Sequence, residues 1–269
     1  MVTVPDISRE FSGQVVVVTG GGSGIGRAIA ERYSAAGGKA IVLGRREAPL
    51  RETVDRITAA GGLADFACCD MRDAAAVLKT IDDVVQREGR LDALVNNAAG
   101  NFVSPAEKLS PNGWKAVIDI VLNGSFYAAR AAAPHMLAAG SGSILNVIAT
   151  YAWHGHPGTV HSAAAKGGVV AMTRTLAVEW AGRGVRVNAI APGPTETEGA
   201  GAALWGTDEA RARVQSGVPA GRFASPDEIA ESACYLLSGR ASYVTGEVLV
   251  VDGGQWLGKS IYTDERARS

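Results

Sequence analysis

The sequence has little of what secreted or membrane-spanning proteins carry. Only three of its 269 residues are cysteines, at positions 68, 69 and 234, and their spacing forms no disulfide framework. We interpret the adjacent Cys68 and Cys69 as buried strand residues in a reducing compartment. Residues 1–10 lack a positively charged start followed by an apolar stretch, so we expect no secretion signal.

Long hydrophobic runs and an excess of one charge are also missing. The longest apolar runs, at residues 14–19 and 143–149, have the length of strands and are far too short to span a bilayer. A formal net charge of −1 gives no reason to expect nucleic acid or a membrane surface as a partner. Residues 258–269 are polar and end in no recognised peroxisomal address, so we expect a cytoplasmic protein of bacterial origin.

What is present is a regular alternation of short β-branched runs with longer alanine-rich stretches. Continuous apolarity within the short runs predicts strands buried on both faces, and therefore a parallel sheet covered by helices. The expected strands are residues 15–19, 40–43, 63–68, 93–96, 143–148, 185–190 and 248–251. The expected helices are residues 25–36, 48–60, 74–88, 113–139, 163–181 and 227–238. This order predicts an α/β fold, a single Rossmann-type doubly wound sheet with helices on both faces.

Some boundaries are marked by local chemistry. Ser225-Pro226-Asp227-Glu228 supplies an N-cap, a proline at the first helical position and a capping-box glutamate, and Ser110-Pro111 resembles a second helix start. Residues 192–220 break the alternation with glycine, proline and threonine and are too long for a simple turn. We expect one domain over residues 1–269, with a core at 12–190, a mobile substrate lid within 191–222 (centred on 194–220), a last helix and strand at 223–254, and a tail at 255–269.

A glycine-rich segment directly follows the first expected strand and opens the first expected helix. Its glycines let the backbone turn tightly and approach a ligand, while the helix N-terminus offers unpaired N–H groups to a pyrophosphate. Strand before and helix after distinguish this segment from a merely structural turn and predict a dinucleotide site. The residues expected to contact the cofactor here are Gly20, Gly22, Ser23, Gly24, Ile25 and Gly26.

The end of the second expected strand indicates which nucleotide binds. Arg45 and Arg46 stand where an acidic residue would favour a free ribose 2′-hydroxyl, and guanidinium groups favour a 2′-phosphate. We therefore predict NADP(H), with Arg45 as the principal contact and Arg46 stacking or assisting; the alternative is two solvated arginines at a helix start. Two further segments follow later strands and complete the expected site: Asp70-Met71 at the adenine edge, and Asn97-Ala98 beside the cofactor.

These motifs and others later in the sequence resemble the short-chain dehydrogenase/reductase family, and the resemblance covers nearly the whole chain. The resemblance rests on Asn96–Gly100, Asn123, Lys166, the Pro192-Gly193 turn and Asp252-Gly253-Gly254, in that order. It implies that Lys166, Pro192, Gly193 and Thr195 contact the cofactor, and that Asn123 bridges to Lys166 through water or its backbone. Most members carry a tyrosine four residues before the lysine and a serine thirteen before that tyrosine. Here those positions are Ser162 and Ala149, and a serine hydroxyl is a much weaker acid than a phenol.

Closer similarity to the 2,4-dienoyl-CoA reductases accounts for this departure. It covers residues 96–102, 109–111, 119–124, 162–166, 176–180 and 191–194, and residues 241–246 are most similar to the peroxisomal-type members. In mitochondrial-type members, residues matching Tyr151 and Asn101 bind the thioester oxygen, and residues matching Ser162 and Lys166 complete the site. Gly44 stands where these reductases can carry serine, and some peroxisomal-type members lack the tyrosine. The chain therefore mixes features of both branches.

The resemblance implies NADPH-dependent reduction of 2,4-dienoyl-CoA thioesters to 3-enoyl-CoA, a step of unsaturated fatty-acid β-oxidation, with an acyl-CoA thioester as partner. Packing of Tyr151 under the lid and a turn role for Asn101 are the structural alternatives. Two other functions remain open: an NADP(H)-dependent reductase or dehydrogenase of another carbonyl or alcohol, and a nucleotide-binding protein without catalysis. The family's habit also predicts a homotetramer assembled through the helices at 113–139 and 163–181.

Three histidines, His154, His156 and His161, lie close together in the sequence. They stand in a glycine- and proline-rich segment without a carboxylate or cysteine at ligand spacing. We therefore expect no metal site.

Overall fold

The computed structural model describes residues 7–197 and 207–257, and its centre is one seven-stranded sheet. The strand order is β3-β2-β1-β4-β5-β6-β7, and every neighbouring pair is parallel. The strands are β1 (Val15–Thr19), β2 (Lys39–Gly44), β3 (Leu63–Cys68), β4 (Ala93–Asn96), β5 (Gly142–Val147), β6 (Val185–Pro192) and β7 (Val248–Val251). The order reverses direction between β1 and β4, which is where ligands bind in such sheets.

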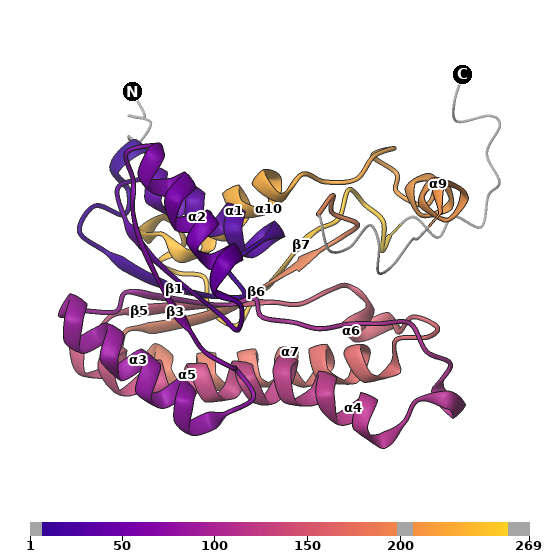
Figure 1. Cartoon of the computed structure of the whole chain (residues 1–269), viewed down its shortest axis with the longest axis horizontal. Helices are drawn as coiled ribbons and strands as arrows, with labels where there is room; N and C mark the ends of the chain where they lie inside the picture. The colour runs from indigo at the N-terminus through magenta and orange to yellow at the C-terminus, as the bar shows by residue number, and fades with distance from the viewer. Residues whose placement is uncertain (1–6, 198–206, 258–269) are drawn as a thin grey trace.

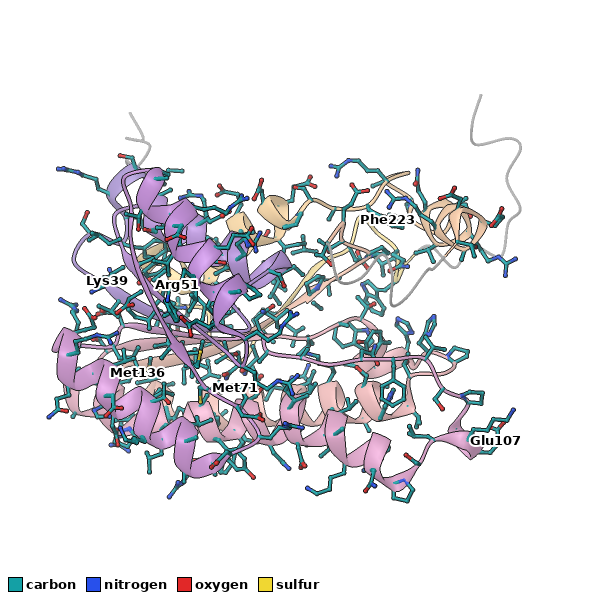
Figure 2. The ribbon with its side chains drawn as sticks, viewed as in Figure 1. Lys39, Arg51, Met71, Glu107, Met136 and Phe223 are labelled. Atoms are coloured by element: carbon teal, nitrogen blue, oxygen red, sulfur yellow. The ribbon has the colours of Figure 1, made fainter. Side chains whose placement is uncertain are left out.

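Helices cover both faces of the sheet, as the alternation predicts. Helices α1 (Gly24–Ala35), α2 (Glu47–Ala59) and α10 (Pro226–Leu237) lie on one face, and α3 (Ala74–Glu88), α5 (Gly124–Ala139) and α7 (Val160–Ala181) lie on the other (Figure 1). Each layer encloses its own apolar cluster against the sheet. Figure 2 shows Met136 in the second layer, where α5 meets the strands, and its side chain is fully buried. The predicted doubly wound α/β fold is confirmed.

At the two helix starts predicted from the sequence, side chains cap the helix. The Ser225 hydroxyl accepts from the Glu228 amide, and the Glu228 carboxylate accepts from the Ser225 amide, which closes a capping box on α10. Ser110 caps α4 (Pro111–Ile118) by accepting from the Gly113 amide. Both caps satisfy backbone N–H groups that have no partner within the helix.

The helix expected over residues 113–139 is interrupted. A π-helical turn, η3 (Asp119–Asn123), joins α4 to α5. Gly124 follows this turn, and a Cβ there would lie 2.9 Å from the Met71 carbonyl oxygen. The absence of a side chain at Gly124 therefore lets the start of α5 approach the loop after β3, a contact between distant segments that helical periodicity does not indicate.

Position in the sheet also corrects the expectation that both adjacent cysteines are buried. Cys69 is buried, whereas Cys68 is exposed. Cys68 ends β3, and β3 is an edge strand that is only partly covered, with Leu63 60% exposed at its start. Full burial holds for the interior of β1, β2 and β4, not for the edge strands β3 and β7.

The segment expected to be a lid contains its own helix, α9 (Asp208–Ser216). Figure 1 shows α9 set apart from the two helical layers, beyond the carboxyl end of β7. Phe223 lies beside α9 (Figure 2) and carries the Arg211 guanidinium over its ring at 4.9 Å. A bridge between Thr195 and Ala224 closes the base of this segment. Residues 198–206 of the expected lid and residues 258–269 of the expected tail lie outside the described residues.

The remaining elements are short. They are α6 (Tyr151–His154) and three 3₁₀ turns, η1 (Ile7–Arg9), η2 (Ala106–Lys108) and η4 (Gly239–Ala241). None of the helices in the described ranges has the length and apolarity needed to cross a membrane.

Candidate active site

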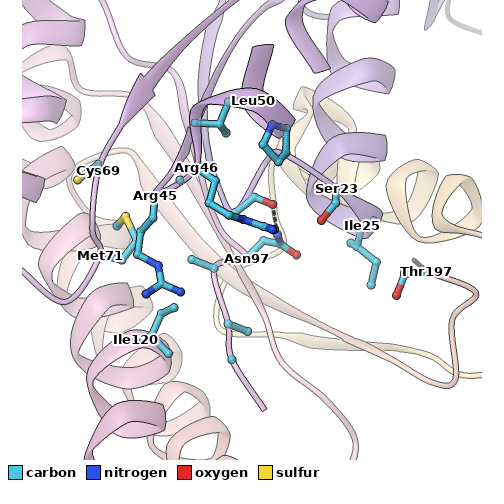
Figure 3. A pocket seen from close by; sticks show the side chains of 18 of the residues that line it. Ser23, Ile25, Arg45, Arg46, Leu50, Cys69, Met71, Asn97, Ile120 and Thr197 are labelled. Carbon is cyan, nitrogen blue, oxygen red and sulfur yellow. Dashed lines mark hydrogen bonds between the residues drawn. The ribbon is translucent and has the colours of Figure 1, made fainter. Parts of the chain in front are cut away.

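The first cavity lies where β1 and β4 diverge and has a volume of about 450 Å³ (Figure 3). Its wall includes most of the residues predicted to hold a dinucleotide: Gly20, Gly22, Ser23, Gly24, Ile25, Arg45, Arg46, Met71, Asn97 and Ala98. The Ser23 side chain makes no cap hydrogen bond to α1. The N-terminus of α1 and the glycine turn therefore face a space large enough for a nucleotide.

Two glycines in this turn serve different purposes. Gly20 has a φ of 67°, and a Cβ there would lie 2.9 Å from the Ala98 Cα. Gly26 is not among the described residues that line the cavity. A Cβ on Gly26 would lie 2.4 Å from both the Asn97 Nδ2 and the Gly20 carbonyl oxygen. Gly20 thus permits the turn, and Gly26 lets α1 approach the strand ends.

The end of β1 also fixes the loop after β4. The Thr19 Oγ1 accepts from the backbone amides of Asn97 and Ala98, each at 3.0 Å. The Asn97 side-chain amide donates to the carbonyl oxygens of Thr19 and Gly20, each at 3.1 Å. Asn97 therefore supports the glycine turn from behind while it lines the cavity.

The charged residues around the cavity are divided between two roles. Arg45 and Arg46 extend from the end of β2 into its wall (Figure 3). Asp70 is not among its described lining residues, and its carboxylate pairs with Arg72 at 2.6 Å. This pairing lowers the pKa of Asp70 to about 2. The pocket wall therefore carries Met71 rather than its acidic neighbour.

Several residues that line the first cavity were not predicted from the sequence. These are Gly44, Pro49, Leu50, Cys69, Ile120 and Thr197. Gly44 and Cys69 directly follow the ends of expected strands, so adjacency was a usable signal. Thr197 and Ile120 reach the site only through the tertiary fold; a Cβ on Gly24 would lie 3.2 Å from the Thr197 methyl carbon.

A second cavity of about 610 Å³ adjoins the first, and Asn101, Ile25 and Thr197 line both. Tyr151 lines it from α6, and Pro192, Gly193 and Thr195 line it from the end of β6. The predicted contacts of the cofactor turn after β6 thus lie in the second cavity, between the nucleotide cavity and Tyr151. Gln255 and Trp256, assigned to the tail, also line it. The Asp252 carboxylate fixes this stretch by accepting from the Trp256 amide at 2.8 Å.

Tyr151 and Ser162 meet in space although eleven residues separate them. The Tyr151 hydroxyl lies 3.0 Å from the Ser162 Oγ. Burial raises the pKa of Tyr151, and the hydrogen bond to Ser162 opposes that shift. The phenol of Tyr151 on α6 therefore reaches the side chain of Ser162 on α7. The structure thereby brings together two predicted residues that periodicity alone could not connect.

Lys166 stands one helical turn after Ser162 and is buried. Its Nζ donates to the Val147 carbonyl oxygen at 2.5 Å. Burial lowers the pKa of Lys166 to about 8, because a low-dielectric environment disfavours the charged form. Lys166 is not among the described residues that line either cavity, so its contact with the nicotinamide ribose stays a prediction.

The two asparagines predicted to be catalytic, Asn123 and Asn101, differ in their hydrogen bonds. The Asn123 Nδ2 donates to the Asp119 Oδ1 at 2.9 Å across the π-helical turn, so its side chain is committed to that turn. The Asn101 Oδ1 accepts from the Phe102 amide at 3.0 Å, which leaves the side-chain NH₂ group as a donor at the junction of the cavities.

The three histidines have separate environments. His154 and His156 line the second cavity, whereas His161 is fully buried behind Ser162 with its ring edge-on to Phe102, at 4.5 Å between ring centroids. Neither His161 nitrogen has a hydrogen-bond partner among the described residues. Within the described ranges, no three histidine, cysteine or acidic side chains come together as a set of metal ligands.

Comparisons with known proteins agree with this geometry. Residues 13–255 match a family model described as enoyl-(acyl carrier protein) reductase. The probable 2,4-dienoyl-CoA reductase [(2E)-enoyl-CoA-producing] of Bacillus subtilis (strain 168) is 50% identical over 246 residues, 91% of this chain and 97% of that protein. The peroxisomal 2,4-dienoyl-CoA reductase [(3E)-enoyl-CoA-producing] of Danio rerio is 38% identical over 254 residues, 94% of this chain and 84% of that protein.

Among solved structures, a Beutenbergia cavernae protein provisionally assigned as an NAD(P)-dependent gluconate 5-dehydrogenase, with NADP bound at low occupancy, superimposes with a TM-score of 0.88. It is 40% identical, and the match covers 93% of this chain and 99% of that chain. The family match and both of these relatives cover more than nine-tenths of the chain. The chain therefore belongs to the short-chain dehydrogenase/reductase family of oxidoreductases.

Proposed function

We propose that this protein is an NADPH-dependent reductase of 2,4-dienoyl-CoA thioesters that acts in the breakdown of unsaturated fatty acids. The observation that carries the proposal is the 3.0 Å contact between Tyr151 and Ser162 at the cavity that Asn101 shares with the nucleotide site. The names of the Bacillus subtilis and Danio rerio relatives support the same substrate class.

The first cavity fits NADP(H) on its own features. Gly20 and Gly24 have φ values of 67° and 53°, so the backbone can turn tightly at the N-terminus of α1, where amide groups suit a pyrophosphate. Two guanidinium groups and no carboxylate stand among the described lining residues, which suits a 2′-phosphate rather than a bare ribose hydroxyl. Arg45 and Arg46 would hold that phosphate, and Lys166 would hold the nicotinamide ribose.

NADPH held in the first cavity would supply the hydride that C5 of the conjugated thioester accepts. Tyr151 and Asn101 donate hydrogen bonds to the thioester oxygen, where negative charge collects as the dienolate forms. When the Ser162 hydroxyl donates to the Tyr151 oxygen, the phenolic proton is free to point at the substrate. By comparison with oxyanion-hole donors, each of these two groups contributes ~3 kcal/mol to the transition state.

Protonation decides the position of the remaining double bond. The proposal places a proton on the α-carbon, from water or Tyr151, which gives a 3-enoyl-CoA. The dienolate is also electron-rich at C4, and protonation there gives a 2-enoyl-CoA. The names of the two relatives differ on this point, (2E) for the Bacillus subtilis protein and (3E) for the Danio rerio protein. Product analysis by NMR therefore belongs with the first assay.

The first test is turnover itself. A 2,4-dienoyl-CoA and NADPH should lose the absorbance of the dienoyl group and of NADPH together. We expect Tyr151→Phe to lower kcat by a factor of ten or more with little effect on NADPH binding, because the substrate oxygen loses a donor. Tyr243→Phe is the matched control, since Tyr243 is fully exposed.

Other outcomes separate the alternatives. A near-normal rate for Tyr151→Phe would remove Tyr151 from the chemistry. Turnover of a gluconate-type sugar acid or another carbonyl, without turnover of any dienoyl thioester, would favour the dehydrogenase alternative that the Beutenbergia cavernae structure suggests. NADPH binding without turnover of any of these compounds would indicate a nucleotide-binding protein without catalysis.

A further inference from the structure

One wall of the second cavity carries positive and imidazole groups that the proposed chemistry does not use. His154 belongs to α6, His156 to the loop after it, and Arg213 to α9. No aspartate or glutamate stands among the described residues that line this cavity. An anionic group placed there would meet several donors and no opposing carboxylate.

Helix α9 divides its arginines between two tasks. Arg211 pairs with Glu196 and lies over the Phe223 ring, so it fastens α9 to the base of the segment. Arg213, two residues later and therefore on another face of the helix, has no ion pair with any of the described residues and lines the cavity. A guanidinium without a carboxylate partner at a cavity wall is suited to recognise a planar or tetrahedral oxyanion of a ligand.

The two histidines are oriented by their own backbone. The His154 Nδ1 lies 2.7 Å from the Gly155 carbonyl oxygen, and the His156 Nδ1 lies 2.9 Å from the Pro157 carbonyl oxygen. Because a carbonyl oxygen only accepts, each Nδ1 carries a proton; in the doubly protonated ring each Nε2 carries one as well and can donate to an anionic ligand. Both rings belong to the short stretch that begins with Tyr151, so an anion held there is positioned relative to the phenol.

The rest of the cavity is mostly apolar. Val103, Val214 and Trp256 line it together with the polar wall. Trp256 is held edge-on against Trp153, with 5.9 Å between ring centroids. A ligand with an apolar stretch and an anionic end matches both parts of this surface, whereas a purely hydrocarbon end would leave the guanidinium without a partner.

We propose that Arg213, His154 and His156 form a subsite for an anionic group of the substrate that is remote from the reacting carbons. This inference rests on the proposed function, which offers two sources of such an oxyanion. One is a phosphate of the CoA moiety; the other is a carboxylate at the far end of the acyl chain. Arg45 and Arg46 belong to the first cavity, so the two anion sites are separate.

The test uses three thioesters with the same dienoyl group: the CoA thioester, the pantetheine thioester, which lacks the phosphates, and a CoA thioester whose acyl chain ends in a carboxylate. We expect Arg213→Gln to raise KM about tenfold, or ~1.4 kcal/mol, only for substrates that carry the bound anion. A rise for both CoA thioesters but not for pantetheine identifies a phosphate, and a rise for the carboxylate-ended substrate alone identifies the carboxylate.

Two variants control for damage to α9. Arg213→Lys keeps the charge and should hold KM within about threefold of wild type, while the double variant His154→Gln/His156→Gln should raise KM for the same substrate as Arg213→Gln. Arg211→Gln removes a charge from the same helix outside the cavity wall and should not discriminate among the three substrates. An equal change of KM for all three thioesters in Arg213→Gln, or no change for any of them, would overturn the proposal.

Failure of the proposed function is distinguishable from failure of the subsite. If the wild-type protein reduces none of the three thioesters, the proposed function is wrong, and the subsite is tested by calorimetry instead. Inorganic pyrophosphate and adipate are titrated into protein saturated with NADP⁺, which fills the first cavity. The subsite predicts binding of at least one probe that Arg213→Gln weakens by a factor of three or more; equal binding by wild type and variant contradicts it.

Discussion

Burial changes the pKa of two side chains at the candidate site, Lys166 and Tyr151, in opposite directions. Lys166 is enclosed on α7, and the loss of solvent lowers its pKa to about 8. Tyr151 is shifted in the opposite sense, since burial raises the pKa of a phenol. Between neutral pH and pH 9, Lys166 therefore changes its charge and Tyr151 does not.

This separation gives a prediction for cofactor binding. As the pH rises through about 8, Lys166 loses its proton and no longer attracts an anionic cofactor. We expect the Kd for NADPH to increase about tenfold between pH 7 and pH 9, as measured by fluorescence titration. Lys166→Arg, which stays charged, should show no such step, and Tyr151→Phe should keep it. A flat profile for wild type over this range would contradict the assignment.

The arginines after β2 give a second prediction at the same scale. Arg45→Ala should lower kcat/KM with NADPH by one to two orders of magnitude and leave kcat/KM with NADH nearly unchanged, because a charge-assisted pair contributes about 1.5–3 kcal/mol. Arg51→Ala is the control, since Arg51 pairs with Glu47, which lies one turn earlier on α2. A clear preference of the wild-type protein for NADH would count against the choice of cofactor.

Among the elements, short segments rather than the long helices set the geometry of the site. Helix α6 has four residues and brings Tyr151 to Ser162, and the π-helical turn η3 commits Asn123 to Asp119. The long helices supply the frame: a buried chain of hydrogen bonds from Asn96 through Asn146 to Thr173 ties β4, β5 and α7 together. A buried chain of hydrogen bonds of this kind favours one arrangement of its elements, although the Asn96 Oδ1 has no partner among the described residues.

Helix α10 permits a stability prediction at the scale of an element. Ser225→Ala removes the hydroxyl that accepts from the Glu228 amide. We expect a loss of about 1 kcal/mol and a Tm lower by about 2–4 °C in differential scanning calorimetry. Ser232→Ala, on the same helix, removes only a bond back to the Glu228 carbonyl and should leave Tm nearly unchanged. Equal effects of the two changes would show that the cap is not the cause.

At the scale of the whole molecule, the apolar surface is distributed unevenly. Five alanines of α5, at positions 128, 129, 131, 132 and 133, are buried within the molecule itself. Larger side chains point outward instead: Phe126 on α5 is 46% exposed and Val178 on α7 is 85% exposed. Both helices lie in the same layer (Figure 1).

This surface is where we expect the tetramer to form. Phe126→Glu combined with Val178→Glu should reduce the molar mass measured by light scattering to that of a smaller assembly, because charges would be buried at the contact. Leu63→Glu alters an exposed apolar residue on the edge strand β3 and serves as the control. A wild-type monomer, or a double variant with the wild-type mass, would show that this face is not the interface.

The sequence by itself determined the class of fold and most of the residues that gather around the first cavity. Strand and helix periods, caps such as Ser225 and the glycines after β1 are local, because each is imposed by backbone sterics or by neighbours within a few residues. The seven strands consequently match their expected positions within two residues. Cys68 is exposed because β3 lies at the edge of the sheet. The strand order places β3 there, and no local pattern in the sequence specifies that order.

Only the tertiary structure decided how the reacting groups meet. Tyr151 reaches Ser162 through a turn and a helix start, Asn101 joins two cavities, and Arg213 arrives from a helix that the sequence presented only as a glycine- and proline-rich interruption. These proximities follow from the packing of segments that are distant in the chain, and no pattern within a short window of residues specifies such packing.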